Sequence, residues 1–170
     1  LNVRQLAREI FIAELRDGLA TADRRDALIF VHGYNVSFAD AARRAAQLAV
    51  DLKFPGRTLL YSWSSSGSPQ NYIMDEETIE WSTPHFEEFL QLAVTEVGAD
   101  SIHLLAHSMG NRALVDALSR FNAGALPPGS AHLQQVIFAA PDVNAGVFRQ
   151  HAARFQHHAE RFTLYASSTD

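Results

Sequence analysis

Five short apolar segments alternate with segments of helical periodicity along the chain, and this alternation is the feature that most restricts the fold. None of the five contains a charged residue, which is typical of strands that are buried on both faces of a sheet. They cover residues 27–31, 58–61, 101–106, 136–140 and 162–166. Buried strands that alternate with helices predict an α/β fold, a three-layer αβα sandwich with a mainly parallel sheet of about five strands.

Apolar residues three and four positions apart predict the helices that precede and connect these strands. Ser37, with Asp40 three residues later, is typical of a helix N-terminus, where a serine side chain accepts a backbone hydrogen bond. Pro84 is expected either to kink the longest helical segment or to begin a second helix within it. The helical segments cover residues 3–18, 37–52, 72–97, 110–121 and 148–155.

Each predicted strand is followed by polar residues. In an open parallel sheet the carboxyl ends of the strands lie at one edge, and ligands bind outside that edge. The chain should therefore collect its functional groups there. The polar clusters cover residues 32–35, 62–68, 107–108, 141–144 and 167–170.

The composition indicates one globular domain over residues 1–170, because a chain with 47 % hydrophobic and 19 % charged residues can bury a single core. A net charge of −5, with no basic stripe, argues against nucleic acid as a partner. No apolar run approaches the roughly 20 residues that cross a bilayer, and no secretion signal is present, so the default expectation is a cytoplasmic protein without a membrane span. The absence of cysteine excludes disulfides and thiolate chemistry.

The segment around Ser108 has the form of a strand, a sharp turn and a helix. Residues 106–110, Ala-His-Ser-Met-Gly, match the pattern A-x-S-x-G, in which a serine lies at a tight turn between a buried strand and a helix. Small residues are needed two positions before and after the serine, because the two backbones nearly touch there, and Ala106 and Gly110 meet this need. The serine of such a turn is usually strained, which favours a nucleophile over a structural residue.

A serine nucleophile needs donors for the negative charge that develops on the substrate's carbonyl oxygen. The N–H of Met109 lies at the N-terminal end of a helix, whose partial positive charge favours an anion. His32, Gly33 and Tyr34 end the first strand, and Gly33 allows a close backbone approach, so the N–H of Tyr34 is the predicted second donor. His32 is expected to order this loop by hydrogen bonding.

Taken in order, these motifs resemble the α/β-hydrolase superfamily, and in particular a bacterial branch described as alpha/beta hydrolases of unknown function. The resemblance extends over residues 28–170 and is carried by residues 32–35, Ser62 and Trp63, residues 106–112, residues 140–143 and residues 164–170. It implies an α/β-hydrolase core, a nucleophile at Ser108, esterase or lipase-like activity on a small-molecule ester, and no metal or organic cofactor. In the superfamily's order the five strands are the third to the seventh of eight.

The superfamily usually places the catalytic acid after the seventh strand and the histidine after the eighth. By this rule Asp170, which follows the last predicted strand, is the predicted acid. Asp142, after the preceding strand, occupies the alternative position known in the superfamily. A simpler interpretation of Asp142 is helix capping, because Pro141 and Asp142 stand before a short helix.

No histidine follows Asp170, and the chain begins with Leu1 instead of methionine. Both features predict a truncated α/β-hydrolase core, whose catalytic histidine is supplied by residues outside this sequence. By itself the 170-residue piece is then expected to be nearly inactive. A second interpretation, which the missing histidine supports, is a binding or scaffold domain that keeps the hydrolase fold without its chemistry.

The histidines within the chain have simpler interpretations than general base. His107 is expected to pack in the turn with its ring away from the hydroxyl of Ser108, and His103 to be a hydrogen-bonded interior residue. His85, at a helix start, and His132, in a loop, are expected in solvent. Three others resemble a metal cluster, but only Glu160 accompanies them at ligand spacing, so a solvated helix face is expected instead: His151, His157 and His158.

The remaining polar residues near the predicted site are interpreted structurally. The acidic run from Asp75 to Glu77 is expected to complement a helix dipole in the first turn. Asn111 and Arg112, just after the sharp turn, are expected to tie the helix to neighbouring loops.

Overall fold

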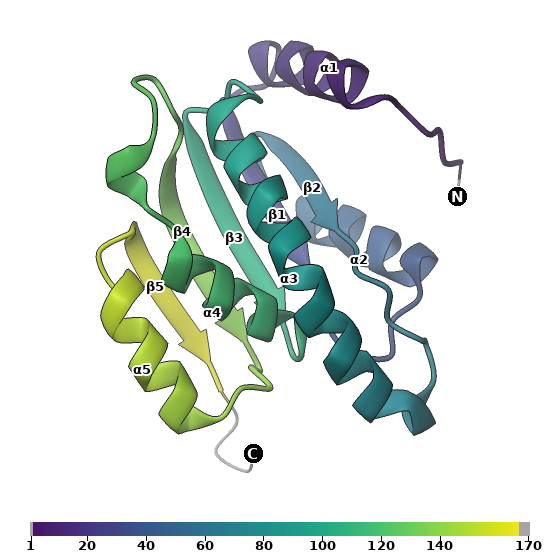
Figure 1. Cartoon of the computed structure of the whole chain (residues 1–170). Helices are drawn as coiled ribbons and strands as arrows, with labels where there is room; N and C mark the ends of the chain where they lie inside the picture. Colours follow the sequence, from purple (N-terminus) through teal and green to yellow (C-terminus); the bar gives the residue numbers. More distant parts are fainter. Residues whose placement is uncertain (1, 167–170) are drawn as a thin grey trace.

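The five strands form one parallel sheet. The structure, a computed structural model, describes residues 2–166. The strand order is β2-β1-β3-β4-β5, and every neighbouring pair is parallel (Figure 1). The predicted α/β class and five-stranded parallel sheet are confirmed. The strands are β1 (Asp26–Val31), β2 (Arg57–Tyr61), β3 (Ser101–His107), β4 (His132–Ala139) and β5 (Ala159–Tyr165).

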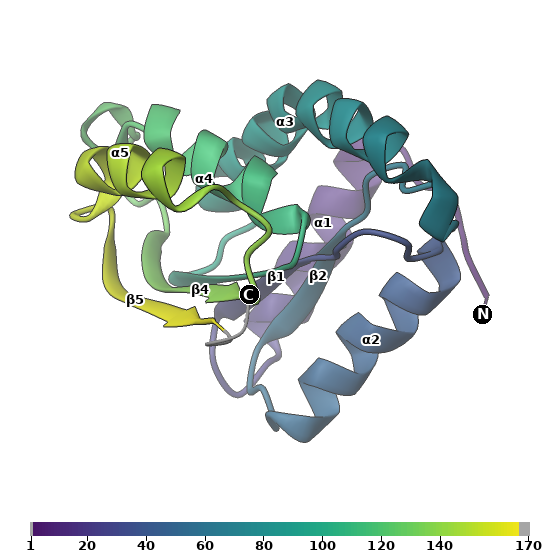
Figure 2. The same cartoon turned by 90° about the horizontal axis from the view of Figure 1, so that it is seen from below.

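Helices cover both faces of the sheet. In Figure 2, α3, α4 and α5 lie on one face and α2 lies on the other, which gives the expected three layers. At the end of α3, the side chain of Arg16 in α1 donates a 2.6 Å hydrogen bond to the carbonyl oxygen of Glu96. The helices are α1 (Arg8–Ala20), α2 (Phe38–Asp51), α3 (Tyr72–Thr95), α4 (Gly110–Arg120) and α5 (Ala145–Phe155), with short 3-10 turns at Pro69–Asn71 and Ala123–Ala125.

The main core lies between the sheet and the layer of α3 and α4. Alternate residues of β3 point into it, and so do the matching residues of β4, because successive side chains of a strand face opposite sides. Strand β1 is buried at all six positions: residues 27–31, as their continuous apolar sequence predicts, and also Asp26, which the apolar pattern does not include. The core residues of the two central strands and of α4 include Ile102, Leu104, Ala106, Val136, Phe138, Leu114 and Leu118.

Helix α1 begins at Arg8, five residues later than the predicted start at residue 3. The apolar spacing of the first residues continues the helical pattern, but Val3 is 62 % exposed, so no core contact stabilises an additional turn. Only Ile12 and Leu19 of this helix are buried.

Helix α3 continues through Pro84 as one helix, so the alternative of a second helix beginning there is wrong. A proline removes the hydrogen bond to the carbonyl four residues earlier, here that of Glu80, which is an exposed residue. On the opposite side, Thr83 and Phe86 are buried against the core and keep the helix in place. His85 therefore lies in the middle of a helix, not at its start, and remains exposed as predicted.

Strand β4 begins four residues before its predicted start at residue 136 and includes His132, which was expected in a loop. Its first residues pair with β3, where Ser101 lies opposite His132, so the ladder extends beyond the apolar segment. Strand β5 is an edge strand with several exposed side chains.

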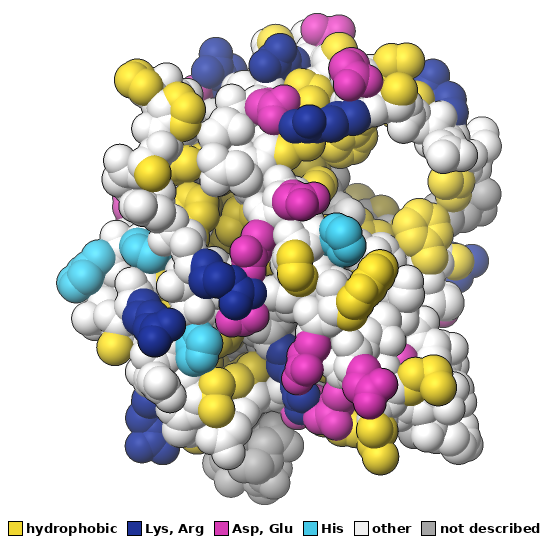
Figure 3. All heavy atoms as spheres, in the orientation of Figure 1, with side chains coloured by type: hydrophobic (Ala, Val, Ile, Leu, Met, Phe, Trp, Pro, Cys, Tyr) yellow, Lys and Arg dark blue, Asp and Glu magenta, His cyan; other side chains and the backbone are white. Residues whose placement is uncertain are grey.

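The surface of the helical layer carries charges of both signs. In Figure 3 the Lys and Arg side chains lie among Asp and Glu side chains and do not form a continuous stripe. Arg120, for example, forms ion pairs with Glu87 and with Asp116. No helix within residues 2–166 combines the length and the apolar character needed to cross a bilayer.

Candidate active site

Ser108 occupies the sharp turn that the sequence predicts. Strand β3 ends at His107 and α4 begins at Gly110, so only two residues join them. The φ angle of Ser108 is +50°, in the left-handed region that residues with a Cβ rarely adopt. Its N–H donates to the carbonyl of Ala139 at 3.0 Å, and its own carbonyl accepts from the side-chain amide of Asn111 at 2.8 Å. The first bond attaches the strained turn to the end of β4, and the second attaches it to the first turn of α4.

The small residues around Ser108 are required by close contacts. A Cβ added at Gly110 would lie 2.5 Å from the carbonyl oxygen of His32, so α4 can approach the end of β1 only with glycine there. A Cβ at Gly33 would lie 2.8 Å from the Cβ of Ser108. The loop after β1 thus lies directly against the turn that carries Ser108.

The two predicted oxyanion donors, Met109 and Tyr34, belong to segments that contact each other at Gly33 and Ser108. Met109 is the N-cap residue of α4, and none of the described residues accepts a hydrogen bond from its N–H. Tyr34 follows Gly33, and its ring contacts that of Tyr72 edge-on at 5.2 Å between centroids. The structure therefore places the loop that contains Tyr34 against the turn that carries Ser108 and Met109.

His32 orders the loop that contains Gly33. The side chain is 1 % exposed, and its Nδ1 lies 2.9 Å from the carbonyl oxygen of Gly33. A carbonyl only accepts, so Nδ1 carries the proton and Nε2 accepts from the hydroxyl of Ser62 at 3.1 Å. The ring stacks on Trp63, whose Nε1 donates to the carbonyl of His32 at 2.8 Å. Burial lowers the pKa of His32, which keeps the ring neutral in this arrangement.

No histidine of residues 2–166 forms a hydrogen bond with the Ser108 hydroxyl. His107 is half-buried, and burial together with the charge of Arg44 lowers its pKa. A Cβ at Gly33 would lie 3.0 Å from its Nδ1, so the ring is near the loop after β1. This position agrees with the packing role that the sequence predicts for His107.

The polar partner of the buried Nε2 of His103 is the carboxylate of Asp26, at a distance slightly longer than an ordinary hydrogen bond. The side chain lies on the face of the sheet away from the main core, and Nε2 is 3.6 Å from a carboxylate oxygen of Asp26. That oxygen is also 3.0 Å from the side chain of Arg24. Burial lowers the pKa of His103, against the attraction of Asp26.

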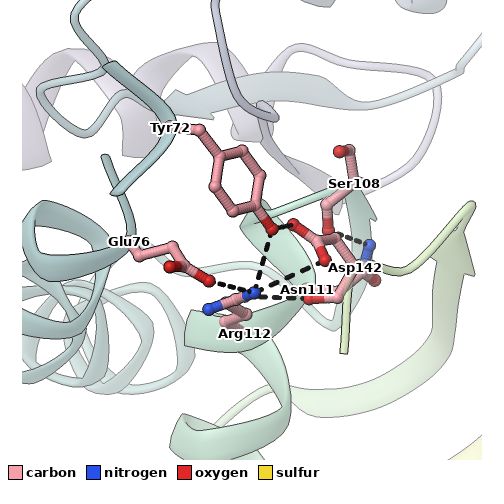
Figure 4. Close-up of polar contacts among 6 residues, drawn as sticks. All are labelled: Tyr72, Glu76, Ser108, Asn111, Arg112 and Asp142. Carbon is pink, nitrogen blue, oxygen red and sulfur yellow. Dashed lines mark hydrogen bonds and ion pairs between the residues drawn. The ribbon is translucent and has the colours of Figure 1, made fainter. Parts of the chain in front are cut away.

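Asp142 belongs to a polar network that joins α3, α4 and the loop after β4 (Figure 4). Tyr72 donates its hydroxyl proton to Oδ2 of Asp142 at 2.6 Å. Arg112 donates to the Asp142 carbonyl at 2.9 Å, and its Nη2 lies 3.4 Å from Oδ1 and 2.7 Å from a carboxylate oxygen of Glu76. The N–H of Asp142 donates to the carbonyl of Ser108 at 3.3 Å. The network is therefore attached to the backbone of the turn.

The charges of this network keep Tyr72 protonated. Burial and the carboxylate of Asp142 raise the pKa of Tyr72 to about 12, so its hydroxyl donates throughout the neutral range. Burial lowers the pKa of Arg112, but the carboxylates of Asp142 and Glu76 raise it by more. The capping interpretation of Asp142 is wrong: the N-cap of α5 is Asn144, whose side chain accepts from Gly146 and Val147.

The sequence interpretation missed the role of Asp75. It lies in the first turn of α3, as expected, but is 1 % exposed and accepts hydrogen bonds from Ser65 and from the backbone of Ser66. The available signal is an aspartate that follows a serine-rich loop and begins a helix. Asp170, the predicted acid, lies outside the described residues.

No group of three potential metal ligands gathers in the described part of the chain. Of the three histidines expected on a solvated face, only His157 is exposed. His151 and His158 each have a buried Nδ1 without a hydrogen-bond partner in residues 2–166, because α5 and the turn after it pack toward α4. His158, for example, contacts the ring of Phe121 edge-on.

Two open grooves lie on the helical layer, and Ser108 lines neither. The larger, of about 790 Å³, runs along α3 and α4 and includes Phe89, Arg120 and Leu126. The smaller, of about 460 Å³, includes Arg112, Val143 and His151, and so borders the Asp142 network.

The family of the chain follows from comparison with known proteins. No curated protein matches the sequence. The profile of a family described as alpha/beta hydrolase of unknown function matches residues 8–170, which includes the turn at Ser108 and the whole sheet. The chain belongs to this family of alpha/beta hydrolases.

Proposed function

We propose that this chain is the catalytic core of a serine hydrolase that cleaves small carboxylic esters through an acyl-enzyme at Ser108. The observation that carries the proposal is the strained backbone of Ser108, with φ of +50°, beside the unpaired N–H of Met109 within the described residues. A strained serine that merely joined a strand to a helix would cost stability without a return in function. The contact of Gly33 with Ser108 adds a second loop to the same place.

In the proposed reaction the hydroxyl oxygen of Ser108 attacks the ester carbonyl carbon, and a histidine takes the hydroxyl proton. The carbonyl oxygen becomes an oxyanion, which the N–H groups of Met109 and Tyr34 hold. Loss of one such donor typically costs about 3 kcal/mol of transition-state stabilisation. The leaving alcohol receives the proton, and water then releases the acid from Ser108. No cofactor takes part.

The proposal assigns the general base to a histidine outside this sequence. It favours Asp170 as the acid that orients this histidine. Asp142 is the alternative, but Tyr72 and Arg112 already contact its two carboxylate oxygens. An acid of the triad must accept a hydrogen bond from the histidine, and at Asp142 the contacts with Tyr72 and Arg112 compete with that bond.

Ser108→Ala in the full-length protein tests the nucleophile. Labelling by a fluorophosphonate should disappear, and the hydrolysis of short p-nitrophenyl esters should fall on the order of 10³-fold or more. Ser119→Ala is the control, because this serine lies near the other end of α4 and its hydroxyl bonds within the helix. Equal labelling and hydrolysis in all three proteins would contradict the proposal. Absence of both from the wild type would favour the scaffold interpretation.

Two isosteric variants test the acid. Asp170→Asn should lower kcat by about 10⁴-fold, because an amide holds the wrong tautomer of the histidine. Asp142→Asn should lower kcat much less and act mainly on stability, since it weakens the bonds to Tyr72 and Arg112. The reverse order of the two effects would make Asp142 the acid.

A further inference from the structure

We propose that Asp75 is a positioning residue, which holds the loop of the second oxyanion donor through the hydroxyl of Ser65. The inference rests on the proposed function, because it concerns how the N–H of Tyr34 is kept in place. It assigns a role to a buried carboxylate that belongs to neither the triad nor the Asp142 network.

Asp75 is a buried carboxylate held by hydrogen bonds. Its Oδ2 accepts from the Ser65 hydroxyl at 2.7 Å, and its Oδ1 accepts from the Ser66 N–H at 2.8 Å. Within residues 2–166 no Lys, Arg or His lies within 4.0 Å of the carboxylate. Burial of an ionised carboxylate without a cation is unfavourable unless strong hydrogen bonds compensate. Both bonds go to the loop after β2, so Asp75 attaches this loop to the first turn of α3.

The Ser65 hydroxyl also forms a hydrogen bond with the loop after β1. A hydroxyl has one proton, and Ser65 donates it to Asp75, so its lone pairs are left to accept. The N–H of Val36 donates to this oxygen at 3.3 Å. Val36 is two residues after Tyr34 in the donor loop. Because the Ser65 hydroxyl points to Asp75, this carboxylate orients the oxygen that accepts from the Val36 N–H.

The two loops are joined at further points, and the joined structure ends at Ser108. His32 contacts Ser62, and Trp63 donates to the carbonyl of His32. Gly33 lies so close to Ser108 that a Cβ added at Gly33 would be 2.8 Å from the Cβ of Ser108. One end of the donor loop is thus held by His32 and Gly33, and the other end by Ser65. Tyr34 lies between the two attachments.

Two adjacent serines provide a matched test in the full-length protein. Ser65→Ala removes the hydroxyl that links Asp75 to Val36 but leaves the bond from the Ser66 N–H to Asp75. Ser66→Ala is the control, because within the described residues only the backbone of Ser66 takes part. Ser65→Thr keeps a hydroxyl and should restore most of the lost function.

The expected result separates positioning from stability. Ser65→Ala should lower kcat by roughly 10- to 100-fold with little change in KM, because a donor misplaced by a fraction of an ångström affects mainly the transition state. Binding of a trifluoromethyl ketone, which forms a tetrahedral adduct with serine, should weaken by a similar factor. Hydrogen exchange at the Val36 amide should accelerate. Ser66→Ala should match the wild type in all three measurements.

Two results would overturn the inference. One is a Val36 amide that exchanges at the same rate in Ser65→Ala as in the wild type. The other is a kcat of Ser65→Ala that falls no further than that of Ser66→Ala, or a fall in kcat with an equal rise in KM. The exchange measurement needs no activity, so it tests the link from Asp75 to the donor loop even where Ser108→Ala shows that the proposed function fails.

Discussion

At the scale of single residues, the site depends on glycines at two positions where the backbone of one segment lies against another. Ser108 adopts φ of +50°, and the backbones of β1 and α4 approach each other at Gly110. A backbone oxygen cannot move aside as the end of a flexible side chain can. The strained turn therefore depends on the absence of a Cβ at Gly110 and at Gly33 as much as on the hydrogen bonds of Ser108.

Gly110→Ala should lower the free energy of unfolding by about 1–3 kcal/mol. Alanine favours a helix over glycine by about 1 kcal/mol, but its Cβ would lie 2.5 Å from the His32 carbonyl oxygen, and this clash outweighs the gain. Urea titration measures the change. Gly124→Ala is the control, since its Cβ would lie 3.4 Å from Oδ1 of Asn122. Equal stability of the two variants would show that the close approach at Gly110 is absent in solution.

At the scale of elements, the beginning of α3 connects two loops of the sheet edge. Tyr72 and Glu76 bind the network of Arg112 and Asp142 after β4. Asp75, between them, binds the loop after β2. One helical turn thus determines how two strand ends lie relative to Ser108. This explains why three polar residues of α3 face inward in a helix whose exposed side is also charged.

A double-mutant cycle with Tyr72→Phe and Asp142→Asn should give a coupling energy of about 1–3 kcal/mol. The bond between them is short, at 2.6 Å, partly buried and made to a carboxylate. With the pKa of Tyr72 at about 12, the coupling should not change between pH 7 and pH 9.

The exposed pair of Asp40 and Arg43 on α2 provides the comparison for this cycle. Its coupling should be much smaller, because solvent screens both charges. Chemical denaturation of the four proteins of each cycle gives the two values. Equal coupling in the two pairs would mean that Tyr72 does not hold Asp142 in solution.

At the scale of the whole molecule, burial of histidines links stability to pH. Burial lowers the pKa of His32, of His103 and of His107 below the ordinary value of 6.5. All three lie on or directly after the central strands, where the sheet excludes water. Well above pH 6.5 these rings are neutral in the folded and in the unfolded chain, so they do not affect the free energy of unfolding there.

The free energy of unfolding should fall as the pH decreases from 6.5 to 5.5, because the unfolded chain binds protons that the folded chain does not. Each buried histidine contributes at most about 1.4 kcal/mol per pH unit. His107→Gln should reduce this slope, since burial and Arg44 both lower its pKa. The exposed His157→Gln should leave the slope unchanged. A wild-type slope of zero between pH 6.5 and 5.5 would contradict the prediction. The lowered pKa of Asp40 does not affect this range, because its ordinary pKa is 3.8.

The sequence by itself determined the layers of the fold and the form of the turn at Ser108. Both depend on local physics: a continuous apolar segment must be buried, and a strand that turns sharply into a helix needs small neighbours. The sequence also indicated that residues of the loop after β1 would lie near Met109, because the carboxyl ends of parallel strands lie at one edge of the sheet.

Only the tertiary structure decided what the polar side chains do. Asp142 is held by Tyr72, which is 70 positions away, and His103 faces the carboxylate of Asp26, which is on another strand. Asp75 has the sequence position of a residue that complements a helix dipole, but the neighbouring loop buries it and gives it two donors. The free energy of a charged or polar group depends on its surroundings within a few ångströms. Those surroundings come from distant parts of the chain, and no local pattern contains them.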